Sequence, residues 1–196
     1  MNARFWQARR IPVTAVGIAV LAVAVWWAGL WLASRPYFSG PLARPPVAVG
    51  GPLIATVLVS RTLIGGDVGL ERSCPRFTPR FRALHALLSW SVPSAALAVT
   101  LLADPGVFGA AAVVRNTAGL VGLTLLTASM APVHVAWAPA TVVAFTSYLA
   151  SGHAEGVGAA WWGWLLRPGV LDASWVVALG LLITGFITYQ RRGPRR

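Results

Sequence analysis

The stretch VTAVGIAVLAVAVWWAGLWLA, from Val13 to Ala33, contains no charged residue and decides the class of this protein. A helix needs about 20 mostly apolar residues to cross roughly 30 Å of hydrocarbon at about 1.5 Å per residue. Five further stretches are apolar over comparable lengths, which predicts an all-α polytopic membrane protein with six transmembrane helices. The predicted spans are residues 13–33, 47–64, 83–103, 107–130, 135–150 and 175–189.

Composition supports this class over a water-soluble one. The 196 residues are 57% hydrophobic and 11% charged, which leaves too little polar surface to cover a soluble globule of this size. The net charge of +11 comes entirely from arginines, and most of them lie just outside the apolar stretches. Arginines in those positions orient membrane proteins, so we expect the lipid bilayer as partner and no nucleic-acid binding.

The segments between the spans predict a single membrane domain over residues 1–196. Residues 1–10 form a short amphipathic segment, and residues 65–82 are the most polar internal stretch, expected as a cytoplasmic loop. Residues 151–174 are too aromatic for a free linker and too interrupted to cross, which favours an outer interfacial or re-entrant segment.

Counting arginines predicts the orientation. With both termini in the cytoplasm, eleven arginines lie inside and three, Arg35, Arg44 and Arg167, lie outside. The cytoplasmic set is Arg4, Arg9, Arg10, Arg72, Arg76, Arg80, Arg82, Arg191, Arg192, Arg195 and Arg196.

Few residues suggest chemistry. The sequence has no phosphate-binding loop, no HExxH and no GxSxG motif, and the spans hold no paired acids, so we expect no catalytic residue, no cofactor and no enzyme activity. The single cysteine, Cys74, excludes an internal disulfide and multi-cysteine zinc sites. The three histidines, His85, His134 and His153, fall on different sides of the membrane, so we expect no metal site.

Arg115 and Asn116 are the one strongly polar pair inside an apolar run. An arginine at mid-span costs about 2.5–3.5 kcal/mol on insertion scales, so it usually faces a partner, a cavity or the headgroups. The pair predicts either a substrate-path or interhelical contact, or an arginine that snorkels from a tilted helix.

The layout resembles the permease subunits of ABC-type exporters of the bacterial polysaccharide and drug export superfamily. The stretches LERSCPRFTPRFRALH (Leu70–His85) and VVRNTAGLVGLTLL (Val113–Leu126) also look like small permease-like proteins of high-GC actinobacteria. The resemblance implies a transport subunit in the bacterial plasma membrane that dimerises or pairs with a similar chain. It also implies a separate ATPase that docks on the loop before the third span, through Asp67, Glu71, Arg72, Arg76, Arg80 and Arg82.

A non-transporting membrane subunit, such as an anchor or immunity-type protein, fits the same spans without an ordered docking helix. This alternative stays open at the level of the sequence, and neither substrate nor direction of transport follows from the residues.

Overall fold

The structure is a computed structural model that describes residues 10–35, 44–64, 79–101, 109–149, 162–167 and 173–195. The described residues form six α-helices and two short 3-10 turns, with no strand among them, as the all-α prediction requires. The helices are α2 (Ile11–Ala33), α3 (Arg44–Leu63), α5 (Pro79–Leu101), α7 (Ala110–Met130), α8 (Ala138–Leu149) and α10 (Ala173–Arg192). The 3-10 turns are η3 (Val133–Val135) and η5 (Trp164–Leu166).

Four of these helices, α2, α5, α7 and α10, are long and apolar enough to cross a membrane. The apolar part of α3 is shorter, Val47–Leu63, and the 12 residues of α8 rise only about 18 Å, less than the hydrocarbon thickness. The four candidate spans indicate a multi-pass membrane protein.

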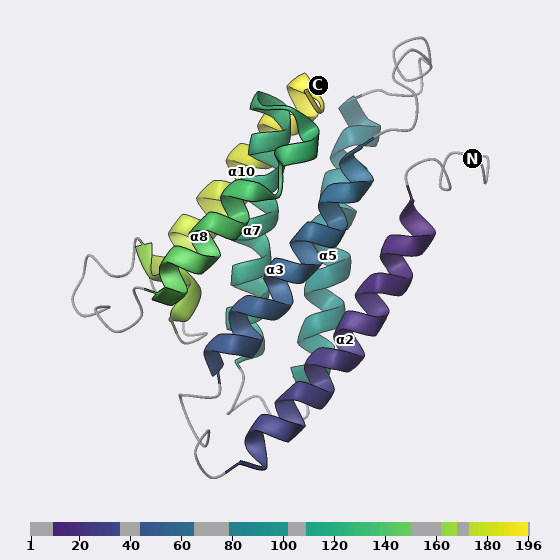
Figure 1. The fold of residues 1–196 in the computed structure, drawn as a ribbon. Coiled ribbons are helices and arrows are strands. Elements are labelled where there is room, and N and C mark those ends of the chain that lie inside the picture. The colour runs from purple at the N-terminus through teal and green to yellow at the C-terminus, as the bar shows by residue number, and fades with distance from the viewer. Residues whose placement is uncertain are drawn as a thin grey trace.

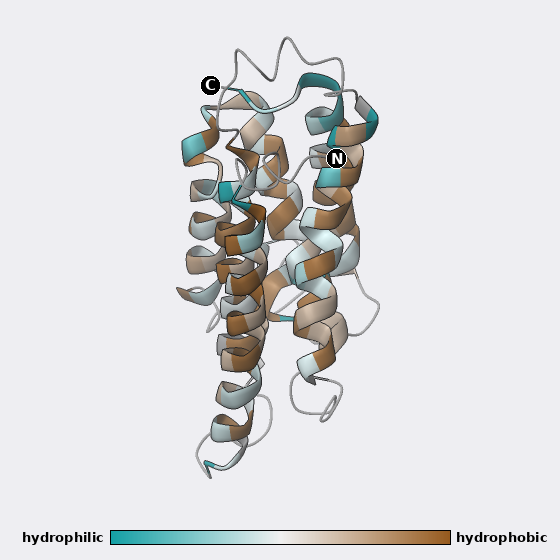
Figure 2. Cartoon of the chain, turned by 90° about the vertical axis from the view of Figure 1, so that its right-hand side faces the viewer, coloured by the Kyte–Doolittle hydropathy of each residue, from teal (hydrophilic) through white to brown (hydrophobic). Residues whose placement is uncertain are grey.

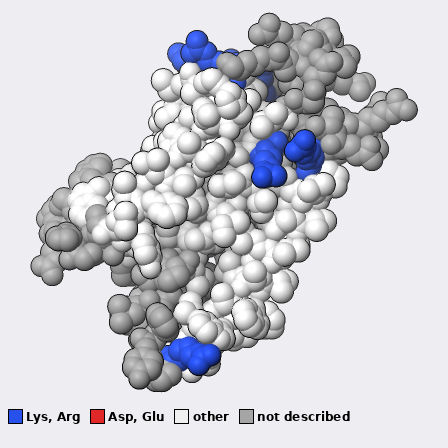
Figure 3. Space-filling model, viewed as in Figure 1, with Lys and Arg blue, Asp and Glu red and all other residues white. Residues whose placement is uncertain are grey.

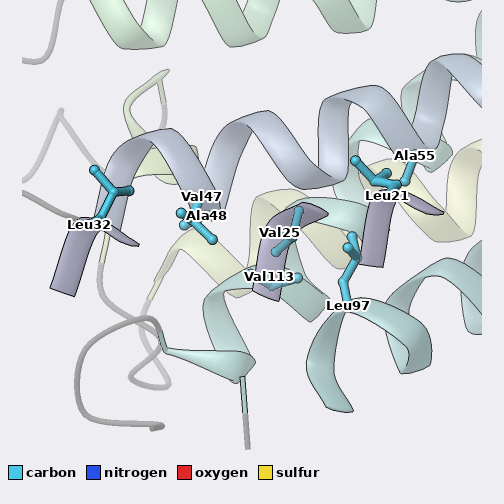
Figure 4. Close-up of a cluster of buried hydrophobic side chains, with 8 residues drawn as sticks. All are labelled: Leu21, Val25, Leu32, Val47, Ala48, Ala55, Leu97 and Val113. Carbon is cyan, nitrogen blue, oxygen red and sulfur yellow. The ribbon is translucent and has the colours of Figure 1, made fainter. Parts of the chain in front are cut away.

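Successive long helices alternate in direction, so α2 begins and α10 ends at the same end of the bundle (Figure 1). Helix α7 lies in the middle, in contact with α3, α5, α8 and α10, whereas α2 packs from outside on α3 and α5. The cluster of Figure 4 joins this outer helix to the bundle, with Leu21 and Val25 of α2 against Leu97 of α5 and Val113 of α7.

The outer faces are apolar. Large hydrophobic side chains are exposed along α2, α5, α8 and α10, among them Val16, Leu87, Phe145 and Ile183. Many polar side chains are instead buried, including Thr56, Thr117 and Ser129, whose hydroxyls donate to carbonyls of their own helices. Figure 2 shows the hydrophobic colour along the helices and the hydrophilic colour gathered toward one end of the bundle. An apolar exterior around partly polar contacts suits lipid as the surrounding solvent.

Arginines cap both ends unequally. Seven described arginines lie at the end where α2 begins, and three lie at the opposite end, as the helix order dictates. The first group is Arg10, Arg61, Arg80, Arg82, Arg191, Arg192 and Arg195, and the second is Arg35, Arg44 and Arg167. Figure 3 shows basic side chains in the upper half of the visible face and at its lower tip, with none between them. No Asp or Glu is among the described residues. We call the first group the arginine-rich end.

Some boundaries differ from the predicted ones. Helix α5 begins at Pro79, so residues 79–82 of the predicted loop are helical, because proline is favoured in the first turn of a helix. The predicted fifth span is divided into η3 and a later-starting α8, with Pro139 in the first turn of α8. Pro93 lies inside α5 without ending it. The predicted amphipathic segment up to residue 9 and residues 65–78 lie outside the described residues.

Candidate functional site

The candidate site lies in the second turn of α7, the most buried of the candidate spans. Fourteen residues of this helix are buried, and the run from Arg115 to Gly122 is buried without interruption. Arg115 and Asn116 are both fully buried, at 0% exposure. Two strongly polar side chains at this depth must satisfy their hydrogen-bonding groups within the protein.

Arg115 joins α7 to the start of α10. Its Nη1 donates to Ser174 Oγ at 2.8 Å, and its Nη2 donates to the carbonyl oxygen of Arg167 at 2.7 Å. Its Nε and Nη2 also donate to Asn116 Oδ1, at 3.2 and 3.1 Å. An arginine that snorkels to the headgroups would be exposed, and this guanidinium is enclosed, so the snorkelling interpretation is wrong for the structure.

Asn116 joins two other segments. Its Nδ2 donates to the carbonyl oxygen of Ala48 in α3 at 2.8 Å and to that of Leu165 in η5 at 2.7 Å. The Ala48 carbonyl lacks its donor within α3 because Pro52, four residues later, has no N–H, and Leu165 lies in the short 3-10 turn η5. One amide therefore ties α3 and η5 to α7, while its oxygen holds the guanidinium of Arg115.

The network holds a short segment inside the bundle. In residues 162–167, the side chains of Trp164 and Leu165 are buried, and Ser147 Oγ of α8 donates to the carbonyl oxygen of Trp162 at 2.9 Å. A Cβ placed on Gly119 would overlap the indole ring of Trp164, so only glycine admits the tryptophan here. The segment 162–167 packs against α3, α7, α8 and α10, as a chain that dips into the bundle would.

A second feature of α7 is its close crossing with α10. A Cβ on Gly122 would overlap the backbone of Leu181 and Leu182, and a Cβ on Gly185 would overlap the carbonyl of Gly122. Small residues let two helices approach closely within a bilayer, where apolar burial gives no drive to associate. We call this contact the glycine crossing.

The end of the chain closes the arginine-rich end. The backbone N–H of Arg195 donates to the carbonyl of Ala128 at 2.6 Å, and its carbonyl accepts from the N–H of Val133 at 2.9 Å. Its Nη1 donates to the carbonyl of Met130 at 3.0 Å. These bonds fasten residue 195 to the turn after α7.

A pair of buried aromatic side chains supports the same end. His85 Nδ1 of α5 lies 3.3 Å from the hydroxyl of Tyr189 in α10, in hydrogen-bonding distance. His85 is thus a buried side chain with a hydrogen-bonding partner.

The structure separates the other predicted residues. Arg80 and Arg82 lie in the first turn of α5, whereas Asp67, Glu71, Arg72 and Arg76 of the predicted docking loop lie outside the described residues, as do Cys74 and His153. Within the described ranges, no three potential metal ligands come together.

Sequence reasoning missed the partners of the Arg115–Asn116 pair. Ser174 and Leu165 are 59 and 49 residues away along the chain, and nothing in their local sequence indicates the contact. The spacing of Ala118 and Gly122 was a usable signal, since small residues four apart are typical of close helix contacts in membranes.

Comparison with models of protein families, with curated proteins and with solved structures finds no match to this chain.

Proposed function

We propose that the chain is the transmembrane permease subunit of an ATP-driven, ABC-type exporter, which works with a separate cytoplasmic ATPase and a second permease chain. Six helices in alternating order, with a basic end and an apolar exterior, are the features that support it. These 196 residues contain no nucleotide-binding motif, so the proposal assigns ATP to a separate subunit.

The proposal includes a topology. The arginine-rich end faces the cytoplasm of a bacterial plasma membrane with both termini, since seven described arginines lie there against three at the other end. Helices α3 and α8 complete six spans. Because α8 is short, the buried segment 162–167 fills the remaining depth on the outer side as a re-entrant element.

The single observation behind the docking proposal is the position of the α3–α5 connection. Ile64 and Pro79, the described residues on either side of it, both lie at the arginine-rich end, where Arg80 and Arg82 begin α5. A cytoplasmic ATPase would contact this connection through the predicted set of Asp67, Glu71, Arg72, Arg76, Arg80 and Arg82.

The test uses the full chain and a Walker-motif ATPase encoded by a neighbouring reading frame. After co-expression and purification in mild detergent, we expect the ATPase to co-elute with the wild type and with the opposite-end control Arg35→Ala. The double variant Glu71→Ala/Arg72→Ala should reduce co-elution by about tenfold or more, the usual effect of losing charged contacts in an interface. The proposal is contradicted if the ATPase co-elutes equally with Glu71→Ala/Arg72→Ala and with Arg35→Ala, or if no neighbouring reading frame encodes an ATPase.

The alternative is a non-transporting membrane subunit. The burial of the Arg115–Asn116 network is one observation that favours it. Arg115 and Asn116 are enclosed and bonded to protein groups, so in this conformation they stabilise the bundle and do not line an open path. The two functions differ in ATPase activity. A permease is expected to change the hydrolysis rate of its ATPase in proteoliposomes, and an anchor subunit is expected to leave that rate unchanged.

A further inference from the structure

Two arginines of the arginine-rich end belong to the adjoining helices α2 and α3. Arg10 immediately precedes α2 and Arg61 lies in the last turn of α3, and both side chains are exposed. Neither guanidinium has a hydrogen bond or an ion pair, as far as the described residues show. By contrast, Arg195 donates to Met130 and the guanidinium of Arg35 lies 4.8 Å from the ring of Trp31.

The packing of α2 on α3 brings Arg10 and Arg61 to neighbouring levels. Gly17 of α2 faces Leu58 of α3, since a Cβ on Gly17 would meet Leu58 Cδ1 at 3.3 Å. Arg61 is three residues beyond Leu58, and Arg10 is seven residues before Gly17 in the antiparallel helix. Their levels along the bundle therefore differ by about 6 Å, which two long arginine side chains span.

The two arginines lie at the ends of adjoining helices. Arg61 follows Ile54 and Leu58 at helical spacing, so it shares the flank of α3 that faces α2. Arg10 is the N-cap of α2, where its carbonyl accepts from the N–H of Thr14 at 2.9 Å, so it lies at the start of the helix, about two turns before Gly17. Two cations from different helices thus lie close to one seam.

The surroundings of this seam are apolar. Val13 is 72% exposed and Ile54 is 51% exposed, and Ile64 is exposed beside the end of α3. Guanidinium groups that face no carboxylate among the described residues, next to such a surface, are matched by a ligand with an anionic head and apolar tails. Guanidinium groups bind phosphate oxygens in bidentate fashion, and basic sites between membrane helices bind lipid headgroups.

We infer that Arg10 and Arg61 form a binding site for one anionic phospholipid of the leaflet at the arginine-rich end. The two guanidinium groups hold the headgroup phosphate, and the acyl chains lie along the exposed apolar residues of α2 and α3. A soluble phosphate would gain the charge contacts without the apolar ones, so the site prefers lipid.

The experiment measures lipid retention on the full chain, purified from vesicles of equimolar phosphatidylglycerol and phosphatidylcholine and analysed by native mass spectrometry. We expect the wild type to retain phosphatidylglycerol preferentially and Arg10→Gln/Arg61→Gln to lose this preference, by about fivefold for each arginine. The matched control Arg191→Gln/Arg192→Gln removes the same charge from the same end and is expected to keep the preference. The variant Arg10→Lys/Arg61→Lys keeps the charge, and it reports on the site if the glutamine variant does not fold.

Three results would overturn the inference. The first is phosphatidylglycerol retention in the glutamine variant equal to that of the wild type. Where the glutamine variant does not fold, the corresponding result is retention in the folded lysine variant above that of the wild type. The second is an equal loss in the control Arg191→Gln/Arg192→Gln, which would assign the effect to diffuse charge at this end. The third is equal thermal protection of the detergent-solubilised protein by glycerol phosphate and by phosphatidylglycerol, which would assign the site to a soluble anion.

Discussion

Helices α2 and α7 are both apolar enough to span a membrane, yet the less apolar of the two is the buried one. In the most apolar 18 residues of each, 67% of α7 is buried against 33% of α2. Helix α2 presents Val16, Trp27 and Trp31 outward, whereas α7 contains Arg115, Asn116 and several glycines and threonines.

The difference shows what holds this bundle together. Lipid tails solvate valine and tryptophan as well as a protein interior does, so apolar side chains give α2 no reason to move inward. Glycines that permit close contact, and polar groups that need partners, do favour the centre. If this explanation is right, matched substitutions in the two helices and their partners have very different effects on stability.

The largest contrast is between two tryptophans. Trp164 is 2% exposed and packs against Gly119 in the interior, whereas Trp27 is 65% exposed and lies on the outer face of α2. We expect Trp164→Ala to lower the free energy of unfolding by about 3–5 kcal/mol, because it leaves a large cavity. The control Trp27→Ala should change it by less than about 0.5 kcal/mol. Denaturant titration in detergent measures both, and equal losses would refute the comparison.

The glycine crossing gives the next largest effect. Gly122→Ala and Gly185→Ala each add a methyl group where backbone atoms already lie, and overpacking of this kind costs about 1–3 kcal/mol. Gly180→Ala, in the same helix as Gly185, adds its methyl group in open space and should be neutral or slightly stabilising. Midpoints of thermal unfolding measured side by side test this, and a Gly180→Ala loss as large as that of Gly185→Ala would contradict it.

The sequence predicts the spanning helices better than it predicts their arrangement. Length and apolarity indicate the long helices α2, α5, α7 and α10, because backbone hydrogen bonds within a helix depend on local sequence alone. The predicted third span begins at residue 83, four residues after the observed start of α5 at Pro79. The arginines that follow Pro79 suggest a loop, although they also fit the first turn of a helix.

Of the candidate site, the sequence predicts only the central pair of residues. Arg115 and Asn116 are conspicuous because a charge inside an apolar run is costly, and that cost indicates that partners exist. It does not indicate which ones. Pro52 leaves the Ala48 carbonyl without its helical donor, but nothing in the sequence indicates that Asn116 meets this carbonyl or that of Leu165, so the join between α3, α7 and η5 required the structure.

That join supports a third and smaller effect. Asn116→Ala removes the donor to the Ala48 and Leu165 carbonyls and the oxygen that accepts from Nε and Nη2 of Arg115, and hydrogen bonds within membrane proteins contribute about 0.6 kcal/mol each and at most about 1.7. We expect a loss of about 2 kcal/mol and faster amide hydrogen exchange in residues 162–167, with exchange in α2 unchanged. Exchange that rises equally in both regions would indicate general loosening instead of release of this segment.

The smallest effect concerns the end of α7 at the arginine-rich end, which residue 195 secures by hydrogen bonds. Arg195→Ala removes only the bond from Nη1 to the carbonyl of Met130, because the backbone bonds of residue 195 to Ala128 and Val133 stay in place. We expect a loss of about 0.5–1 kcal/mol, the usual net contribution of one exposed or partly exposed hydrogen bond. Arg191→Ala, at the same end on the exposed side of α10, is the control and should lose less. Since both variants remove one positive charge, a larger loss for Arg195→Ala isolates the hydrogen bond from the charge, and equal losses would mean that the terminus secures α7 through its backbone alone.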